Sequence, residues 1–359
     1  MFMSREPKVD RVKFQTDLEK YFRDSPNSPF LVFDGSLHLE EPENHGLYTD
    51  VSGIDTLVVK VGTSIIAHDE YQRTIYNMNC ISEDLTRLRE ERGLNILLVT
   101  SGAIGLGRKA RLRKDERIPE KEKDTPAQKR LDAIEGQFLL YELWRHHFFP
   151  QLVGESLVTH DDIRDPQKNA KLLRKYQKLL SEGRIPVINE DDKRSLEEID
   201  ILLKGERAFR DNDSLASLHA QFLKGTGYNP LLVILSNTDG IYTAESIRNG
   251  NYTPIRVVKN TLGLEEQVLL TKEEERALPK STKGREGGGK SKIEAARDAA
   301  SDGVYVVIAN GQFCNHDAPY QERKRGSQRK YDVLDSILDG RVLGTRFLPR
   351  NYVARKMPR

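Results

Sequence analysis

The sequence has few of the features that mark secreted, membrane-spanning or disulfide-stabilised proteins. Its 359 residues include only two cysteines, Cys80 and Cys314, which excludes a disulfide scaffold and indicates a reducing compartment. No apolar run approaches the ~18 residues that a membrane span needs, and residues 1–10 lack the apolar core of a secretory signal. We therefore expect a cytoplasmic protein with no membrane partner.

An excess of charge of one sign is also missing. Lys and Arg number 57 against 55 Asp and Glu, a net charge of +2, so no overall field favours nucleic acid and none is expected as a partner. Basic runs such as 108–114 are explained by solvated loops. No metal-ligand spacing and no catalytic triad is found among His146, His147, His160, His219 and His316. The acidic segment Asn189–Asp192 could bind a divalent metal, a cationic amine or only water, and no metal ligand is assigned to the protein from the sequence.

From Thr56 onward, apolar strands alternate with amphipathic helices. The expected strands are 57–61, 96–99, 156–158, 185–188, 231–235 and 304–308, and the expected helices are 71–92, 128–148, 169–182, one beginning near Asp213, and 292–300. This alternation predicts an α/β fold, with a mostly parallel central sheet sandwiched between helices. In such sheets, ligands bind beyond the carboxyl ends of the strands. For residues 1–55 we expect a short helix and a loosely structured extension. Segments 108–127 and 193–210 are expected to be long polar loops between elements, which could serve as lids.

The segment Phe209–Ala216 places Asp211, Asn212 and Asp213 directly before an apolar helical stripe. One interpretation is a simple helix N-cap, a position that Asp and Asn favour. A functional interpretation gains weight because other expected strands also end in polar or glycine-containing turns. Lys60 lies inside a β-branched run beside Gly62, where a buried lysine indicates a role, although a snorkelling edge lysine is the alternative.

The glycine-rich segment Gly284–Ser291 fits the G-x-x-x-x-G-K-[ST] pattern of a Walker A loop. That motif needs a buried strand before it, whereas 271–283 is charged and contains Pro279. We favour a phosphate-contacting loop of another kind, since a helix follows whose free N–H groups suit phosphate. A flexible glycine linker is the weaker alternative.

Six segments in this order resemble the amino acid kinase superfamily, and within it the glutamate 5-kinases, over about residues 56–348. They are Lys60–Ser64, Val99–Ile104, Pro186–Asp192, Asp211–Leu215, Asp239–Thr243 and Gly287–Lys292. The Ser-Gly-Ala-Ile and Ile-Asn-Glu-x-Asp segments are the most specific for the glutamate enzymes. Acetylglutamate, aspartate, carbamate and uridylate kinases are less similar there.

The resemblance implies a role for each matched position. Lys60 and Lys292 would be the catalytic lysines on the ATP side, and Asp213 the aspartate that holds both. Glutamate would be bound by Ser101, Gly102, Asn189, Asp192 and Asn212. ATP would contact Lys60, Gly62, Ser236, Asn237, Gly287, Gly288, Gly289 and Lys292, with Asn237 replacing an aspartate often found in the family.

The same resemblance implies ATP-dependent phosphorylation of L-glutamate with Mg²⁺, the first step of proline biosynthesis. It implies a kinase domain over 56–350, with a glutamate-binding lobe to about 230, an ATP-binding lobe beyond it, a tail at 351–359 and no C-terminal domain of the PUA type. A dimer or tetramer, proline as feedback inhibitor and glutamyl-phosphate reductase as partner are further expectations. Acetylglutamate or aspartate kinase, a P-loop NTPase using Lys290 and Ser291, and a non-catalytic phosphate- or RNA-binding module are the alternatives.

Overall fold

Three runs of buried, largely apolar residues form the centre of the sheet. In the computed structural model these are β3 (Thr56–Val61), β4 (Asn95–Thr100) and β7 (Pro230–Ser236). They are parallel and in register, so that Lys60 on β3 lies between Val99 of β4 and Ile234 of β7. The structure describes residues 30–40, 50–66, 71–113, 125–191, 212–250, 252–271, 273–274, 289–311, 333–340 and 343–352.

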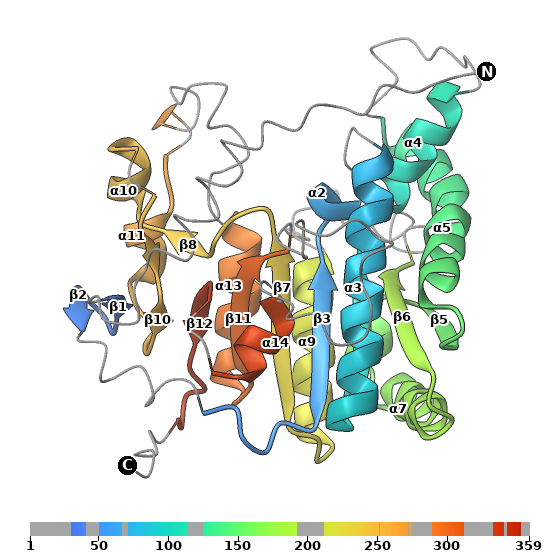
Figure 1. Cartoon of the computed structure of the whole chain (residues 1–359). Coiled ribbons are helices and arrows are strands. Elements are labelled where there is room, and N and C mark those ends of the chain that lie inside the picture. The colour runs from blue at the N-terminus through green and yellow to red at the C-terminus, as the bar shows by residue number, and fades with distance from the viewer. Residues whose placement is uncertain are drawn as a thin grey trace, which may run out of the picture.

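Among the described residues, the main sheet contains ten strands (Figure 1). In spatial order they are β2 (Leu37–Glu40), β1 (Phe30–Phe33), β10 (Val257–Val258), β12 (Thr345–Phe347), β11 (Tyr305–Asn310), β7, β3, β4, β6 (Ile185–Glu190) and β5 (Val153–Val158). Only the β1–β2 and β11–β12 pairs are antiparallel, which confirms the predicted α/β fold with a mostly parallel sheet. A separate antiparallel pair joins β8 (Ile241–Tyr242) to β9 (Pro254–Ile255).

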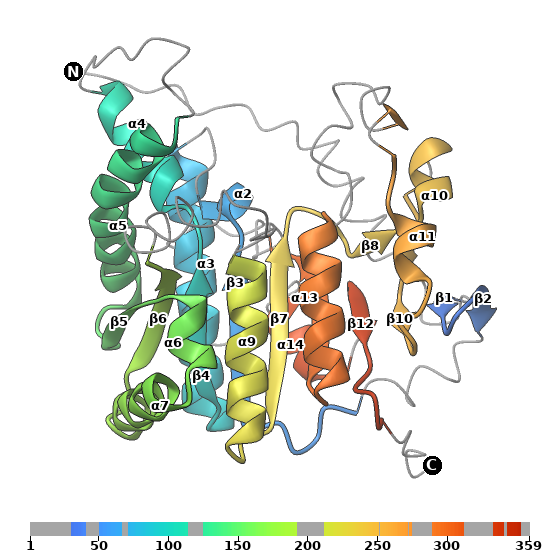
Figure 2. The same ribbon diagram turned by 180° about the vertical axis from the view of Figure 1, so that it is seen from behind.

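Helices cover both faces of the sheet and divide the core into two layers. The helices are α2 (Thr63–Ile66), α3 (Tyr71–Arg92), α4 (Ala103–Arg113), α5 (Pro126–Phe148), α6 (His160–Arg164), α7 (Pro166–Ser181), α9 (Asn212–Gly225), α10 (Ala244–Arg248), α11 (Leu264–Val268), α13 (Lys290–Ser301) and α14 (Val333–Leu338). Side chains of α3, α5 and α14 join one core layer, in front of the sheet in Figure 1. Those of α7, α9 and α13 join the other, in front in Figure 2.

The segment 30–40 differs from the loose extension expected for residues 1–55. It forms a hairpin whose strand β1 pairs in parallel with β10, and the side chains of Val32 and Phe33 are fully buried. The backbone N–H groups of Arg256 and Lys259 donate to the carbonyls of Leu31 and Phe33. Burial of this apolar pair explains why the hairpin joins the sheet edge. The predicted boundary at residue 55 and the division into lobes stay predictions.

The predicted bounds of the polar loop over 108–127 are wrong at both ends, because α4 runs on to Arg113 and α5 begins at Pro126. Thr125 caps α5 by accepting a hydrogen bond from the Gln128 N–H, at 3.2 Å. Gly107 and Gly136 let the two helices touch backbone to backbone, since a Cβ at either position would collide with main-chain atoms of the other helix. The glycines after β4 therefore serve helix packing as well as the turn. The second expected loop, 193–210, lies outside the described residues.

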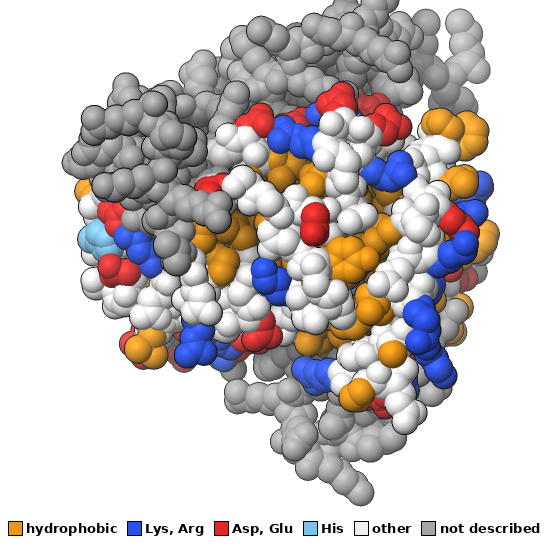
Figure 3. Space-filling view, turned by 90° about the horizontal axis from the view of Figure 1, so that it is seen from below, with side chains coloured by type: hydrophobic (Ala, Val, Ile, Leu, Met, Phe, Trp, Pro, Cys, Tyr) orange, Lys and Arg blue, Asp and Glu red, His pale blue; other side chains and the backbone are white. Residues whose placement is uncertain are grey.

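The carboxyl ends of β3, β4, β6, β7 and β11 all lie along the upper edge of the sheet in Figure 1. Figure 3 views the molecule from the other end, where charged side chains are dispersed among apolar ones. The residues singled out in the sequence therefore gather at the upper edge, apart from that face.

Candidate functional site

The alternation of β3 decides which face of the sheet receives Lys60. Val59 and Val61 belong to the core layer beneath α3 and α5, whereas Val58 belongs to the layer beneath α9 and α13. Because successive side chains of a strand point to opposite faces, Lys60 lies on the face of Val58. Its buried ammonium group therefore meets the amino-terminal ends of α9 and α13.

There the structure brings together the three charged residues that the resemblance selected. The carboxylate of Asp213 pairs through Oδ1 with Lys60 Nζ and through Oδ2 with Lys292 Nζ, the latter at 3.4 Å. Ser291 Oγ also donates to Asp213 Oδ2, at 3.5 Å. Lys60 and Asp213 are only 5% and 3% exposed. We call Lys60, Asp213 and Lys292 the charged cluster.

The electrostatics of the charged cluster suit an anionic ligand. Burial by itself would raise the pKa of the Asp213 carboxyl, but the ammonium groups of Lys60 and Lys292 outweigh burial and hold that pKa below its usual range. Asp213 thus stays ionised at neutral pH. Two ammonium groups facing one carboxylate leave a single positive charge in excess, at an edge where an anion can approach.

The Walker A interpretation gains no support from the lysine beside Ser291. Lys290 is half-exposed and pairs with Glu294 of its own helix, at 3.6 Å. Lys292, two positions further, reaches Asp213 instead. Gly289 directly precedes α13. The predicted contacts at Gly287 and Gly288 lie outside the described residues.

A second group of predicted residues lies at the carboxyl ends of β4 and β6. Asn189 is on the α5 face, where its Nδ2 donates to Gln137 Oε1 at 2.7 Å. Its Oδ1 is buried and has no hydrogen-bond partner among the described residues. Ser101 directly follows β4, with its N–H donating to the Val61 carbonyl at 3.1 Å. The following Gly102 adopts a φ of 106°, a conformation that glycine tolerates best.

Asn212 connects the two groups of residues. Its Oδ1 accepts a hydrogen bond from the Glu190 backbone N–H, at 3.3 Å, next to Asn189. The residue that follows it is Asp213, the centre of the charged cluster. The start of α9 therefore carries Asn212, predicted to bind glutamate, directly beside Asp213, predicted to hold the lysines on the ATP side. Asp192, the remaining predicted glutamate ligand, lies outside the described residues.

One backbone contact and two side-chain contacts lie at the ends of β3, β7 and β11, along the same edge. The Gly62 N–H donates to the Leu235 carbonyl at 3.3 Å. Ser236 Oγ donates to Asn237 Oδ1 at 3.4 Å, just past β7. Asn310, at the end of β11, donates from Nδ2 to Asp239 Oδ1 at 2.8 Å. No sequence pattern marks Asn310 as a site residue. Only the pairing of β11 with β7 places it beside Ser236.

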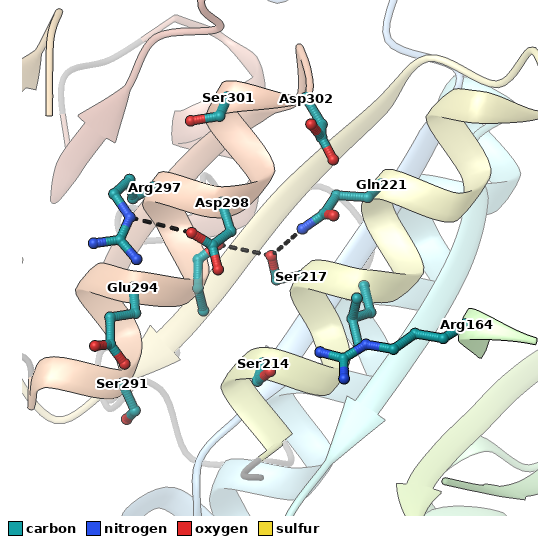
Figure 4. Close-up of a pocket in the computed structure, with 12 residues that line it drawn as sticks. Arg164, Ser214, Ser217, Gln221, Ser291, Glu294, Arg297, Asp298, Ser301 and Asp302 are labelled. Carbon is teal, nitrogen blue, oxygen red and sulfur yellow. Dashed lines mark hydrogen bonds and ion pairs between the residues drawn. The ribbon is translucent and has the colours of Figure 1, made fainter. Parts of the chain in front are cut away.

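A groove of about 490 Å³ runs between α9 and α13. Figure 4 shows Ser214, Ser217 and Gln221 on one wall, Glu294, Asp298 and Ser301 on the other, and Arg164 reaching in from α6. Ser214 and Ser291 line it, each beside a member of the charged cluster, but the cluster itself does not. The groove therefore lies beside the predicted site.

Among the described residues, no group of three or more His, Cys, Asp or Glu side chains is arranged to hold a metal ion. None of the described helices is both long enough and apolar enough to cross a membrane.

The profile of the amino acid kinase family matches residues 55–310. The chain therefore belongs to the amino acid kinase family, and the predicted resemblance is confirmed. Glutamate 5-kinases are among the curated relatives that it resembles. The one from Clostridium acetobutylicum is 30% identical over 306 residues, which cover 84% of this chain and 97% of that protein. The one from Caldanaerobacter subterraneus subsp. tengcongensis is 32% identical over 295 residues, which cover 82% of this chain and 68% of that protein.

Solved structures give a more distant likeness. Giardia carbamate kinase is 14% identical, covers 83% of this chain and 100% of its own, and superposes with a TM-score of 0.47. At this distance we draw nothing about substrate from it.

Proposed function

We propose that this protein transfers the γ-phosphoryl group of ATP to the side-chain carboxylate of L-glutamate, giving L-glutamyl 5-phosphate for proline biosynthesis. The charged cluster carries the proposal, because it offers two ammonium groups, held by the buried carboxylate of Asp213, to a phosphoryl group at the carboxyl edge of a parallel sheet. The relatives named glutamate 5-kinase, matched over most of the chain, support the choice of substrate.

The chemistry requires charge neutralisation more than proton transfer. A glutamate side chain, with a pKa near ~4.3, is already ionised at neutral pH and needs no general base. One carboxylate oxygen bonds to the γ-phosphorus while the bond from that phosphorus to the β–γ bridging oxygen breaks, and ADP leaves. Two anions meet in this step, so positioning and positive charge decide the rate. Lys60 and Lys292 supply that charge, and Asp213 holds the two lysines in place.

The polyphosphate of ATP fits this set of donors. Lys60, Lys292 and the glycine backbone near Gly62 and Gly289 would contact it, with Ser236 and Asn237 nearby in the nucleotide-binding part. Bound Mg²⁺ would neutralise further phosphate charge. We assign it no protein ligand, because each oxygen of Asp213 already faces a lysine. Magnesium would be carried by the phosphates themselves, as is common for nucleotide enzymes.

Glutamate would lie against the other group of residues. Ser101 and the N–H groups of the Gly102 turn suit a carboxylate. Asn189, Asn212 and Asp192 suit the ammonium group. A cytoplasmic homo-oligomer, dimeric or tetrameric, that is inhibited by proline and delivers its product to glutamyl-phosphate reductase extends the same proposal.

A coupled ADP-release assay, with hydroxylamine trapping of the acyl phosphate, tests the proposal. We expect turnover with glutamate and Mg-ATP, and a kcat/KM for N-acetylglutamate lower by roughly 10²-fold or more, because polar groups built to hold a free ammonium group would be left unpaired. Trapped hydroxamate must appear with glutamate. Equal kcat/KM values for glutamate and N-acetylglutamate would refute the substrate assignment while leaving kinase activity intact.

A further inference from the structure

Three polar side chains form a hydrogen-bonded chain on the α5 face of the sheet, ending at the predicted glutamate site. Glu155 of β5 accepts a hydrogen bond from Gln137 Nε2 of α5, at 2.9 Å. Gln137 Oε1 in turn accepts from Asn189 Nδ2 of β6, at 2.7 Å. Gln137 is thus the link between the exposed carboxylate of Glu155 and the buried carboxamide of Asn189, which is only 2% exposed. We call these three residues the amide chain.

The Glu155 carboxylate at one end of the amide chain decides which group donates and which accepts in both of its hydrogen bonds. An ionised carboxylate can only accept, so Gln137 must turn its NH₂ group toward Glu155 and its oxygen toward Asn189. Asn189 must then present its NH₂ group to Gln137. The Asn189 oxygen is left facing away from Gln137, and it has no hydrogen-bond partner among the described residues.

A buried acceptor without a donor is costly, on the order of 1–3 kcal/mol. Such an atom is retained where a ligand or an ordered water supplies the missing donor. Asn189 lies at the carboxyl end of β6, next to the Glu190 N–H that bonds Asn212. The unsatisfied oxygen therefore belongs to the edge where ligands of parallel sheets bind.

We infer that Gln137 is a positioning residue, which holds the Asn189 carboxamide with its oxygen toward the substrate so that it accepts from a free ammonium group. The inference rests on the proposed function and deepens it. Gln137 touches no reacting atom and acts only through Asn189. Glu155 sets the polarity of the amide chain, which would otherwise be free to turn Asn189 by 180° and present an NH₂ group that repels an ammonium ion.

Gln137→Met tests this directly, because methionine keeps the length of the side chain and removes both hydrogen bonds. The KM for glutamate should rise roughly tenfold, the scale of ~1.4 kcal/mol for one hydrogen bond to a charged group. Saturated kcat and the KM for ATP should change less than about twofold, since the charged cluster does not touch Gln137. The matched control is Gln128→Met in the same helix, where Gln128 Nε2 donates to Asp132 at 3.1 Å. This control should leave all three constants unchanged.

Glutarate, which is glutamate without its amino group, separates positioning from mere packing. In Gln137→Met, inhibition by glutarate should keep its wild-type constant while glutamate binds more weakly. In an Asn189→Ala background, Gln137→Met should have no further effect on the KM for glutamate. Equal losses for glutarate and glutamate, or independent effects in the double variant, would overturn the inference and leave Gln137 as a packing contact.

Glu155→Gln keeps the test valid if Gln137→Met does not fold. Glutamine at 155 can offer either end of its amide, so the direction of the amide chain is no longer fixed. The KM for glutamate should then rise by a few-fold, with the glutarate constant again unchanged. An unchanged KM for glutamate would contradict the inference. Failure of the wild-type protein to phosphorylate glutamate would instead contradict the proposed function itself.

Discussion

The charged cluster and the amide chain approach the same edge of the sheet from opposite faces. Lys60 of β3 faces Asp213 at the start of α9, which also pairs with Lys292 at the start of α13, so this face holds three formal charges. On the other face, Gln137 of α5 and Asn189 of β6 are neutral, and the only charge of the amide chain lies at its outer end, on Glu155. Asn212 links the start of α9 to β6, because its Oδ1 accepts from the backbone N–H of Glu190, the residue after Asn189.

The difference between them follows from what each has to recognise. A phosphoryl group in transfer carries negative charge that must be neutralised. Charged side chains stabilise it enough to offset the free-energy cost of removing them from water. An ammonium group that only has to be selected can be held by oriented dipoles. Changes in the charged cluster should therefore act mainly on kcat, and changes in the amide chain mainly on the KM for glutamate.

The largest expected effect is that of Asp213→Asn. The substitution keeps the size of the side chain and removes the charge that holds both lysines, so kcat should fall by roughly 10²–10³, the scale of losing one preorganised electrostatic group. The KM for glutamate should change far less. Steady-state kinetics with folding checked by circular dichroism measures both. A near-normal kcat would reduce Asp213 to a structural residue and remove the contrast between the two faces.

A somewhat smaller effect is expected at the start of α13. Lys292→Met should lower kcat by roughly 10², because one of two ammonium groups near the phosphoryl group is lost. Lys290→Met, two positions earlier, is the control, since its ammonium group pairs only with Glu294 among the contacts described. It should keep kcat within about twofold. The reverse order of effects would favour the Walker A alternative, in which Lys290 contacts phosphate.

The smallest effect is on stability in acid. Burial opposes ionisation of Asp213, but the two lysines hold its pKa below the usual range in the folded protein. A lowered folded-state pKa gives stability that is complete above the unfolded-state pKa of ~3.9 and is lost as the pH falls through the lower folded value. Urea unfolding should therefore show the wild-type advantage over Asp213→Asn constant above about pH 5 and shrinking below about pH 4.

The sequence predicts best those features that depend on residues close together in the chain. The order of turns, the strands that precede them and the helix after Asp213 are all local patterns, and the structure has them within a few residues. Lys60 was singled out because a lysine inside a β-branched run conflicts with burial unless it has a partner. The hairpin at 30–40 is not predictable in this way. A four-residue strand is too short to show a clear alternation of apolar and polar residues, so it resembles a loop until its partner β10 is known.

The sequence by itself determined the fold class, the family and the identity of the charged residues, since periodicity and motif spacing are properties of neighbours in the chain. Tertiary structure decided which partners those residues have. Only the parallel pairing of β3, β4 and β7 brings Lys60 to α9, and only the packing of α5 on the sheet sets Gln137 against Asn189, 52 positions along the chain. The direction of an amide is not encoded in its own residue type, because it is fixed by a carboxylate that folding places beside it.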